Sequence, residues 1–163
     1  ASTYLNKLSD IMRFMLYETK TEKIPLSKEL EYIEKYVDLQ RIRTATPNYV
    51  EYLVEGEVHD RLIEPMLFIP LVENAFKYSA LREKENAIQI RIAITENQLV
   101  FDCTNKYKEG AQQPQEYGGL GITLIEKRLL ALYPKKHHLE ISKNGDTYHV
   151  KLTLQQLWKS LAS

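Results

Sequence analysis

Three side chains with metal- and phosphate-binding chemistry share one face of a predicted helix within residues 64–79. Asn74, Lys77 and Tyr78 stand at positions i, i+3 and i+4, a spacing that brings side chains to the same side of an α-helix. An amide oxygen can bind Mg²⁺, whereas an ammonium and a phenol donate to phosphate oxygens. The trio therefore suits a polyphosphate with bound Mg²⁺. The alternative interpretation is a half-buried helix on which Glu73 and Lys77 form an i,i+4 ion pair.

A second candidate for phosphate binding is a glycine-rich turn further along the chain. Gly118, Gly119 and Gly121 precede an amphipathic segment. Its apolar stripe consists of Ile122, Ile125, Leu129 and Leu132. Such a turn at a helix N-terminus presents backbone N–H groups and the positive end of the helix dipole, and both favour phosphate. The alternative is an ordinary loop-to-helix junction that uses glycine for positive φ.

Between these segments, residues 98–105 alternate in polarity like a strand and end at Asn105. The polar stretch 106–115 that follows, with Gly110 and Pro114, is predicted to be a loop. An asparagine at the end of a strand is commonly a turn former. Beside two candidate phosphate-binding segments, its side-chain oxygen is also suited to accept the exocyclic amine of a purine.

The order of these motifs resembles the ATP-binding domain of LytS/YehU-type bacterial sensor histidine kinases. VENAFKYS at 72–79 is followed by a strand ending at Asn105, a polar lid, and GGLGITLIEKRL at 118–129. Upstream, LSDIMRFMLYE and IPLSKELEYIEKYVDLQRIR are similar to the family's sequence after its phosphoacceptor motif. The resemblance extends from about Leu5 to Leu154 and depends on several motifs in a fixed order.

The resemblance implies a role for each polar residue of the motif helix. Asn74 matches the asparagine that coordinates Mg²⁺, and Lys77 matches the basic residue that contacts phosphate. Tyr78 stands where many members have histidine, a place at which tyrosine is also accepted. Glu73 matches the acidic residue beside the asparagine, which could polarise a reacting group or water.

The resemblance also assigns the base-binding residue and the glycine turn. Asn105 falls where many kinases place an adenine-reading aspartate, and its amide lacks the charge, so we expect modest nucleotide affinity. Gly119, Leu120 and Gly121 match the second glycine box, whose backbone would close over the phosphates. Leu124 stands where the family usually has asparagine. Because leucine cannot donate a hydrogen bond, we expect one lid contact to be missing.

None of the histidines has the sequence context of the family's phosphoacceptor. The four are His59, His137, His138 and His149. The first is predicted in a turn, the next two just before a strand, and the last within a strand. The resemblance places the acceptor upstream of this sequence. We therefore expect the chain to bind ATP without phosphorylating itself.

The composition is that of one globular domain with an appendage. Of 163 residues, 44% are hydrophobic and 27% are charged, which is ordinary for a folded domain. The 22 basic and 22 acidic residues balance, which argues against a broad nucleic-acid-binding surface. A single cysteine, Cys103, excludes an internal disulfide and is predicted to be inert in an apolar strand. No apolar run is long enough for a transmembrane helix.

Two segments are predicted: a helical one at 1–45, from the end of a dimerisation region, and an ATP-binding domain at 46–157. A seam at 3- and 4-residue steps marks the first helix and consists of Leu5, Leu8, Met12 and Met15. Ser27 is predicted to cap a second helix. Its inward residues are predicted to be Leu30, Ile33 and Val37. These helices would pack on the ATP domain or on a second subunit, and the resemblance favours a homodimer of the full-length protein.

The remaining elements predict an α+β two-layer sandwich with a mixed sheet, which the resemblance identifies as the Bergerat fold. The predicted strands are 49–56, 57–63, 87–96, 98–104, 139–143 and 147–154. The first two are predicted to form a hairpin, and the last two to turn at Asn144-Gly145. Pro65 is predicted to open the motif helix.

By resemblance, the chain is the catalytic, ATP-binding part of a two-component sensor histidine kinase. ATP with Mg²⁺ would bind between the Asn74 helix and the 118–121 turn. The γ-phosphate would pass to a histidine outside this sequence and then to a response regulator. The implied location is the cytoplasmic domain of an inner-membrane sensor, with membrane segments only upstream.

Two alternatives come from other classes of protein. One is a non-catalytic signalling relay with weak or absent nucleotide binding, which Leu124 and Asn105 favour. The other is an ATP-driven clamp or hydrolase of the same fold. Such clamps carry an acidic residue one helical turn before the asparagine, where this chain has Pro70. The missing acid favours phosphoryl transfer over hydrolysis.

Overall fold

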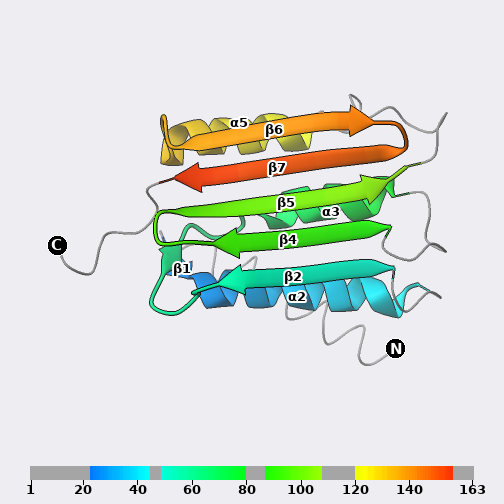
Figure 1. Cartoon of the computed structure of the whole chain (residues 1–163), viewed down its shortest axis with the longest axis horizontal. Helices are drawn as coiled ribbons and strands as arrows, with labels where there is room; N and C mark the ends of the chain where they lie inside the picture. The colour runs from blue at the N-terminus through cyan, green and yellow to red at the C-terminus, as the bar shows by residue number, and fades with distance from the viewer. Residues whose placement is uncertain (1–22, 45–48, 80–86, 108–119, 156–163) are drawn as a thin grey trace.

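The computed structural model of the chain describes residues 23–44, 49–79, 87–107 and 120–155. A five-stranded sheet is covered on one face by three helices (Figure 1). In sheet order the strands are β2 (Val50–Gly56), β4 (Ile88–Ile94), β5 (Gln98–Lys106), β7 (Thr147–Gln155) and β6 (His137–Asn144). The helices are α2 (Leu26–Ile42), α3 (Ile69–Tyr78) and α5 (Leu120–Leu132). Strand β2 runs parallel to β4, whereas the other neighbours are antiparallel, which confirms the predicted mixed sheet.

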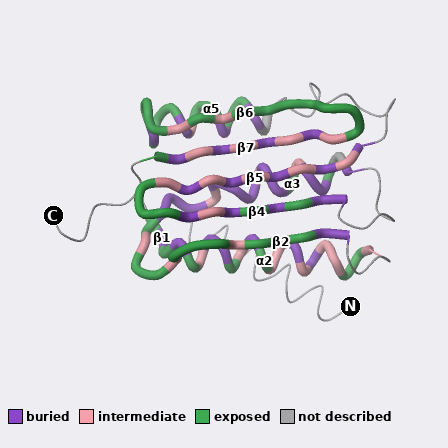
Figure 2. The backbone as a smooth tube through the Cα atoms, in the orientation of Figure 1, coloured by how far each residue is buried: buried purple, intermediate pink, exposed green. Residues whose placement is uncertain are grey.

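Alternating burial explains why the sheet has one covered face. Along β4, β5 and β7, every second residue is buried against the helices, and the residues between them are half-buried or exposed (Figure 2). This period of two is that of a strand with one face on the core and one in water. The open face carries an ion pair between Arg91 and Glu55 at 3.0 Å and a hydrogen bond between His149 and Asp102 at 2.7 Å.

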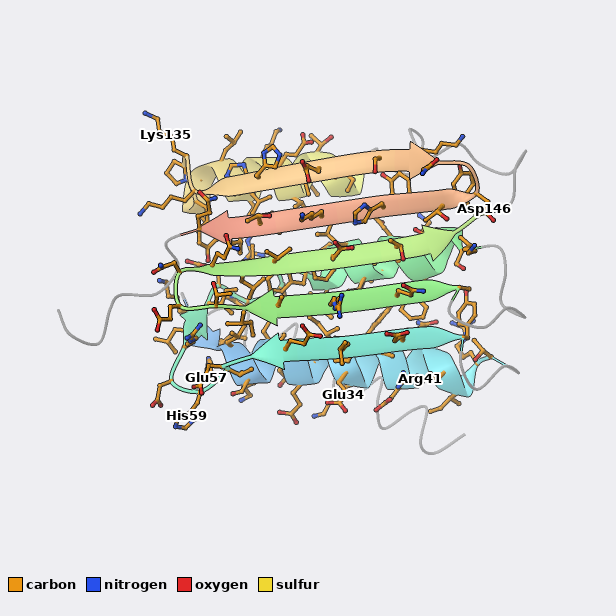
Figure 3. The ribbon with its side chains drawn as sticks, in the orientation of Figure 1. Glu34, Arg41, Glu57, His59, Lys135 and Asp146 are labelled. Carbon is orange, nitrogen blue, oxygen red and sulfur yellow. The ribbon has the colours of Figure 1, made fainter. Side chains whose placement is uncertain are left out.

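Charged side chains gather on that open face and at the rim of the molecule. Figure 3 views the open face, with Glu34 and Arg41 of α2 at the rim below β2, and with Lys135 and Asp146 at the two ends of β6. Within the described residues, no helix is long and apolar enough to span a bilayer.

Helix α2 belongs to the helical layer of the domain. Its predicted inward residues Leu30, Ile33 and Val37 are buried in the same core as the sheet, which confirms that part of the prediction. The predicted cap at Ser27 is wrong, because the helix begins at Leu26 and has no side-chain cap. The Leu26 N–H instead donates to the Arg61 carbonyl at 2.8 Å. The predicted seam at 5–15 lies outside the described residues.

The predicted hairpin of 49–56 with 57–63 is wrong. Strand β2 pairs along its whole length with β4, whose alternate isoleucines are buried. Gly56 ends β2 with a φ of +108°, and a Cβ there would lie 2.0 Å from the Ile94 carbonyl oxygen, so only glycine fits. The short strand β3 (Leu62–Ile63) pairs with β1 (Ile24–Pro25) in a separate two-stranded sheet. Strand β2 therefore pairs with β4, a seven-residue strand with an apolar face, and not with the neighbouring polar segment 57–63.

Two further boundaries differ from the predictions. Helix α3 starts at Ile69 with Pro70 in its first turn, so Pro65 lies in a turn before the helix. The β6–β7 pair is confirmed, but its loop is Gly145-Asp146, because Asn144 still pairs with Thr147. Strand β6 starts at His137, so the two neighbouring histidines lie within it rather than before it. The β4–β5 pair and the end of α5 at Leu132 agree with prediction.

A stacked aromatic pair joins the helical layer to the sheet. The rings of Phe68 and Phe101 lie 5.2 Å apart between centroids at an interplanar angle of 18°, and both side chains are fully buried. Offset stacking at this distance adds to the free energy of burying the rings.

Replacing the strand partner of this pair tests its contribution to stability. We expect Phe101→Ala to lower the free energy of unfolding by about 3–5 kcal/mol, since it leaves a cavity under α3. Urea denaturation measures the loss. Val100→Ala, on the open face of the same strand, is the control and should cost about 1 kcal/mol or less. Equal losses in the two variants would contradict the expectation.

Candidate functional site

Helix α3 divides its residues between the core and the site. Its buried side is formed by Leu71, Val72, Ala75 and Phe76, as predicted. Asn74 is half-buried at the edge of this apolar side, whereas Glu73 and Lys77 are exposed. Partial desolvation raises the pKa of the Glu73 carboxyl beside the asparagine. The predicted ion pair of Glu73 with Lys77 stays a prediction.

Asn74 and Asn105 line the same small cavity, although 31 positions separate them in sequence. Its other lining residues are Leu71, Ala75, Cys103, Ile122, Tyr148 and Val150. The cavity therefore lies where α3, the end of β5 and the first turn of α5 meet. Its volume of about 10 Å³ is room for about one water, so a purine ring requires the lining side chains to move apart.

Asn105 presents an unpaired polar group at this cavity. The residue is only 3% exposed, and its Nδ2 has no hydrogen-bond partner among the described residues. Buried polar groups are nearly always paired, and leaving one unpaired costs about 1–3 kcal/mol. Rotating the amide exchanges its donor and acceptor, so the side chain can offer either group to a bound molecule.

The other predicted site residues are only partly described. Tyr78 ends α3, and Leu120 and Gly121 form the first turn of α5, next to the cavity residue Ile122 in sequence. Gly119 lies outside the described residues. Leu124 is 54% exposed and lies on a separate groove.

A metal at Asn74 would need ligands beyond the side chains described here. Among the described residues, no group of three or more His, Cys, Asp or Glu side chains could hold a metal ion. Mg²⁺ commonly binds through one or two protein oxygens, water and substrate phosphates. The Asn74 amide fits that mode as a single protein ligand.

The four histidines are not among the residues that line the small cavity, whereas Cys103 is. His149 and His138 lie next to carboxylates on the open face, and His59 lies beside Asp60 in a turn, as predicted for a turn residue. His137 Nδ1 lies 2.7 Å from the Tyr133 carbonyl oxygen. Burial raises the pKa of the Cys103 thiol to about 12, which keeps it protonated and unreactive, as the sequence predicts.

A buried carboxylate that sequence reasoning missed lies before α3. Glu29 of α2 is fully buried, and its Oε2 accepts a hydrogen bond from the Met66 N–H at 3.1 Å. From α5, Arg128 donates to the carbonyls of Pro65 and Met66. One signal was available in the sequence, because Glu29 lies within the apolar stripe of its own helix, beside Leu30.

An apolar groove runs beside this turn, between the start of α3 and α5. It has a volume of about 160 Å³. Its lining residues are Met66, Leu67, Pro70, Leu124, Ile125 and Arg128. The groove is therefore distinct from the cavity that Asn74 and Asn105 share.

Comparison with known proteins points to one family. A family model described as "Histidine kinase" matches residues 1–47. A sensor protein kinase, HptS of Staphylococcus aureus, is 34% identical over 107 residues, which are 64% of this chain and 20% of that protein. The chain thus spans about a fifth of the length of the curated relatives it matches.

Solved structures share the fold. The catalytic domain of the histidine kinase ThkA, free of nucleotide, has a TM-score of 0.53 at 13% identity, over 82% of this chain and 94% of that one. The Acinetobacter baumannii histidine kinase AdeS has a TM-score of 0.58 at 13% identity, over 94% of this chain and 75% of that one. These likenesses confirm the predicted fold of histidine kinase catalytic domains.

The surroundings of Glu29 predict a pH-dependent stability. Burial raises the pKa of its carboxyl from 4.5 to about 7, although backbone N–H groups and Arg128 act in the opposite direction. Between pH 4.5 and 7 the unfolded chain releases this proton while the folded chain keeps it, so stability falls as pH rises through this window. The loss is on the order of 3 kcal/mol.

Urea denaturation between pH 4 and about 8 measures this contribution. We expect Glu29→Gln to remove this part of the slope, because the amide does not ionise. Glu31→Gln is the matched control, since Glu31 is exposed on the same helix. The same pH dependence in wild type and Glu29→Gln would contradict the assignment.

Proposed function

We propose that this chain is part of a sensor histidine kinase, and that its five-stranded sheet with α3 and α5 is the ATP-binding catalytic part. ATP with Mg²⁺ would bind between α3 and the start of α5, and its γ-phosphate would pass to a histidine outside this sequence. One observation carries the proposal. The two asparagines predicted for metal and base line one cavity at the first turn of α5, and the Asn105 amide there is unpaired.

Each site residue would take part by binding and orientation. Asn74 would hold Mg²⁺ through its amide oxygen, while Lys77 and Tyr78 would contact phosphate oxygens. Gly119, Leu120 and Gly121 would offer backbone N–H groups at the N-terminus of α5. When bound, Mg²⁺ neutralises phosphate charge. Phosphoryl transfer of this kind depends mostly on positioning and electrostatic stabilisation, so no protein nucleophile is required at the site.

Transfer is favoured over hydrolysis by the residue one helical turn before Asn74. Pro70 occupies that place in the first turn of α3, where it offers no carboxylate to activate water. Glu73 lies beside Asn74 and is the remaining acid that could polarise the acceptor. This arrangement disfavours the ATP-driven hydrolase alternative.

The wider assignments belong to the same proposal. Residues 1–45 would end the dimerisation region, with α2 packed on the ATP-binding domain of residues 46–157, and the full-length protein would be a homodimer. Its acceptor histidine would pass the phosphoryl group to a response regulator. The chain would then be the cytoplasmic domain of an inner-membrane sensor.

A non-catalytic relay is the second candidate, and one observation favours it. The cavity between Asn74 and Asn105 holds about 10 Å³, far less than a purine ring occupies. A domain that keeps this cavity closed would bind nucleotide weakly and transmit signals through α2 alone. Nucleotide titration separates the two functions.

Calorimetric titration with a non-hydrolysable ATP analogue, with and without Mg²⁺, is the direct test. We expect Mg²⁺-dependent binding that Asn74→Ala weakens roughly tenfold or more, since the protein ligand of the metal ion is lost. Asn97→Ala, in the exposed β4–β5 turn, is the matched control and should bind like wild type. Absence of binding by the folded wild type would favour the relay.

The base-binding role of Asn105 has its own test. We expect Asn105→Asp to strengthen binding of the ATP analogue about tenfold, because a carboxylate accepts the adenine amine more strongly than an amide does. The affinity for a non-hydrolysable GTP analogue should not increase, since guanine carries an acceptor oxygen where adenine carries its amine. Titrating both analogues against both proteins measures the selectivity. Equal gains for the two nucleotides would contradict a contact with the exocyclic amine.

A further inference from the structure

A strained turn precedes the helix that carries Asn74. Residues 65–68 join β3 to α3, and Met66 in this turn has a φ of +63°. L-residues other than asparagine and aspartate rarely adopt this conformation, which costs on the order of 1–3 kcal/mol. Such a backbone persists only where its surroundings hold it. The 65–68 turn therefore needs contacts from outside its own sequence.

Glu29 holds the turn from one side. Its Oε2 accepts from the Met66 N–H at 3.1 Å, and the N–H groups of Leu67 and Phe68 also stabilise its carboxylate. Phe68 stands at the N-cap of α3 but provides no side-chain hydrogen bond. The carboxylate thus fixes the chain just before the N-terminus of α3, although it comes from a different helix.

Arg128 holds the turn from the other side. Its guanidinium donates to the Met66 carbonyl at 2.9 Å and to the Pro65 carbonyl. The N–H groups of the turn therefore face an acid from α2, while its carbonyls face a base from α5. Since all three helices lie on the same face of the sheet, one four-residue turn connects the whole helical layer (Figure 1).

The turn is also the direct link between α2 and the candidate site. Asn74 lies less than two helical turns after Phe68, and α5 carries Arg128 in the same helix as the cavity residue Ile122. Helix α2 lies within the segment that the histidine kinase family model matches, residues 1–47. A displacement of α2 would therefore reach Asn74 through the carboxylate of Glu29.

We propose that Glu29 is a positioning residue that couples α2 to the nucleotide site by holding the 65–68 turn. Withdrawal of its carboxylate leaves the Met66 N–H unpaired, and Arg128 then supplies the remaining side-chain hydrogen bonds to the strained end of the turn. The turn then relaxes, and the first turn of α3 loosens with it. The effect on ATP rests on the proposed function, whereas the effect on the turn does not.

Amide hydrogen exchange of the ligand-free protein tests the coupling. In Glu29→Ala we expect exchange to increase at least tenfold for the N–H groups of residues 66–72, with β5 and β7 unchanged. Glu29→Gln should restore most of the protection, because its amide oxygen still accepts from Met66. Glu31→Ala is the matched control on the exposed side of α2 and should exchange like wild type.

The same variants are then titrated with the ATP analogue and Mg²⁺. We expect Glu29→Ala to weaken binding about tenfold and Glu29→Gln to keep near wild-type affinity. If the wild type binds no nucleotide, the proposed function fails, while the exchange data still decide the role of Glu29. Unchanged exchange at 66–72, or an equal increase across the sheet, overturns the proposal.

A second variant covers the case in which Glu29→Ala does not fold. Arg128→Met keeps the length of the side chain but removes its donors to Pro65 and Met66. We expect faster exchange confined to residues 66–72 in this variant as well. Exchange equal to wild type in Arg128→Met would overturn the picture of a turn held from both sides.

Discussion

The stacking of Phe68 on Phe101 is the contact on which the geometry of the site depends. Phe68 is the N-cap residue of α3 and Phe101 lies near the middle of β5, so their 5.2 Å stack fixes the start of the helix over the strand. Asn74 follows on the helix and Asn105 on the strand, both towards the same cavity. Because protein interiors are close-packed, a change in this contact would alter the distance between the two asparagines. The relative position of the two asparagines therefore depends on an apolar contact.

Four buried polar residues interrupt the apolar core, namely Glu29, Glu64, Ser79 and Asn105, and two of them, Glu29 and Asn105, differ in what they bind. Glu29 Oε2 has a partner in the Met66 N–H, which offsets part of the cost of burial, whereas its Oε1 has none among the described residues. The Asn105 amide nitrogen has no partner, and its surroundings are a cavity rather than a backbone. The first pattern is that of a structural contact, and the second is that of a group waiting for a ligand. The degree of burial alone does not distinguish Glu29 from Asn105.

Local periodicity was enough to predict the parts of the fold that depend on neighbours in sequence. The face of α3 that carries Asn74 and the β4–β5 pair follow from spacing within one segment. The strand that pairs with β2 could not be predicted from local spacing, since the parallel pairing of β2 with β4 depends on competition between distant segments. The burial of Glu29 was not predicted, because the inward face of its helix was assigned from apolar residues only. A charged residue inside such a stripe signals a buried partner, but the sequence does not say which one.

The burial of α2 limits how a signal can reach the site. Its residues Leu30, Ile33 and Val37 lie in the same core as the sheet, so the helix cannot swing as an independent appendage. Small sliding shifts of packed helices are the motion that such an interface allows. A shift of this kind moves the Glu29 carboxylate relative to the 65–68 turn, and a hydrogen bond weakens steeply once its distance and angle leave the narrow favourable range. Any coupling between α2 and Asn74 should therefore operate through the polar contact while the core stays intact.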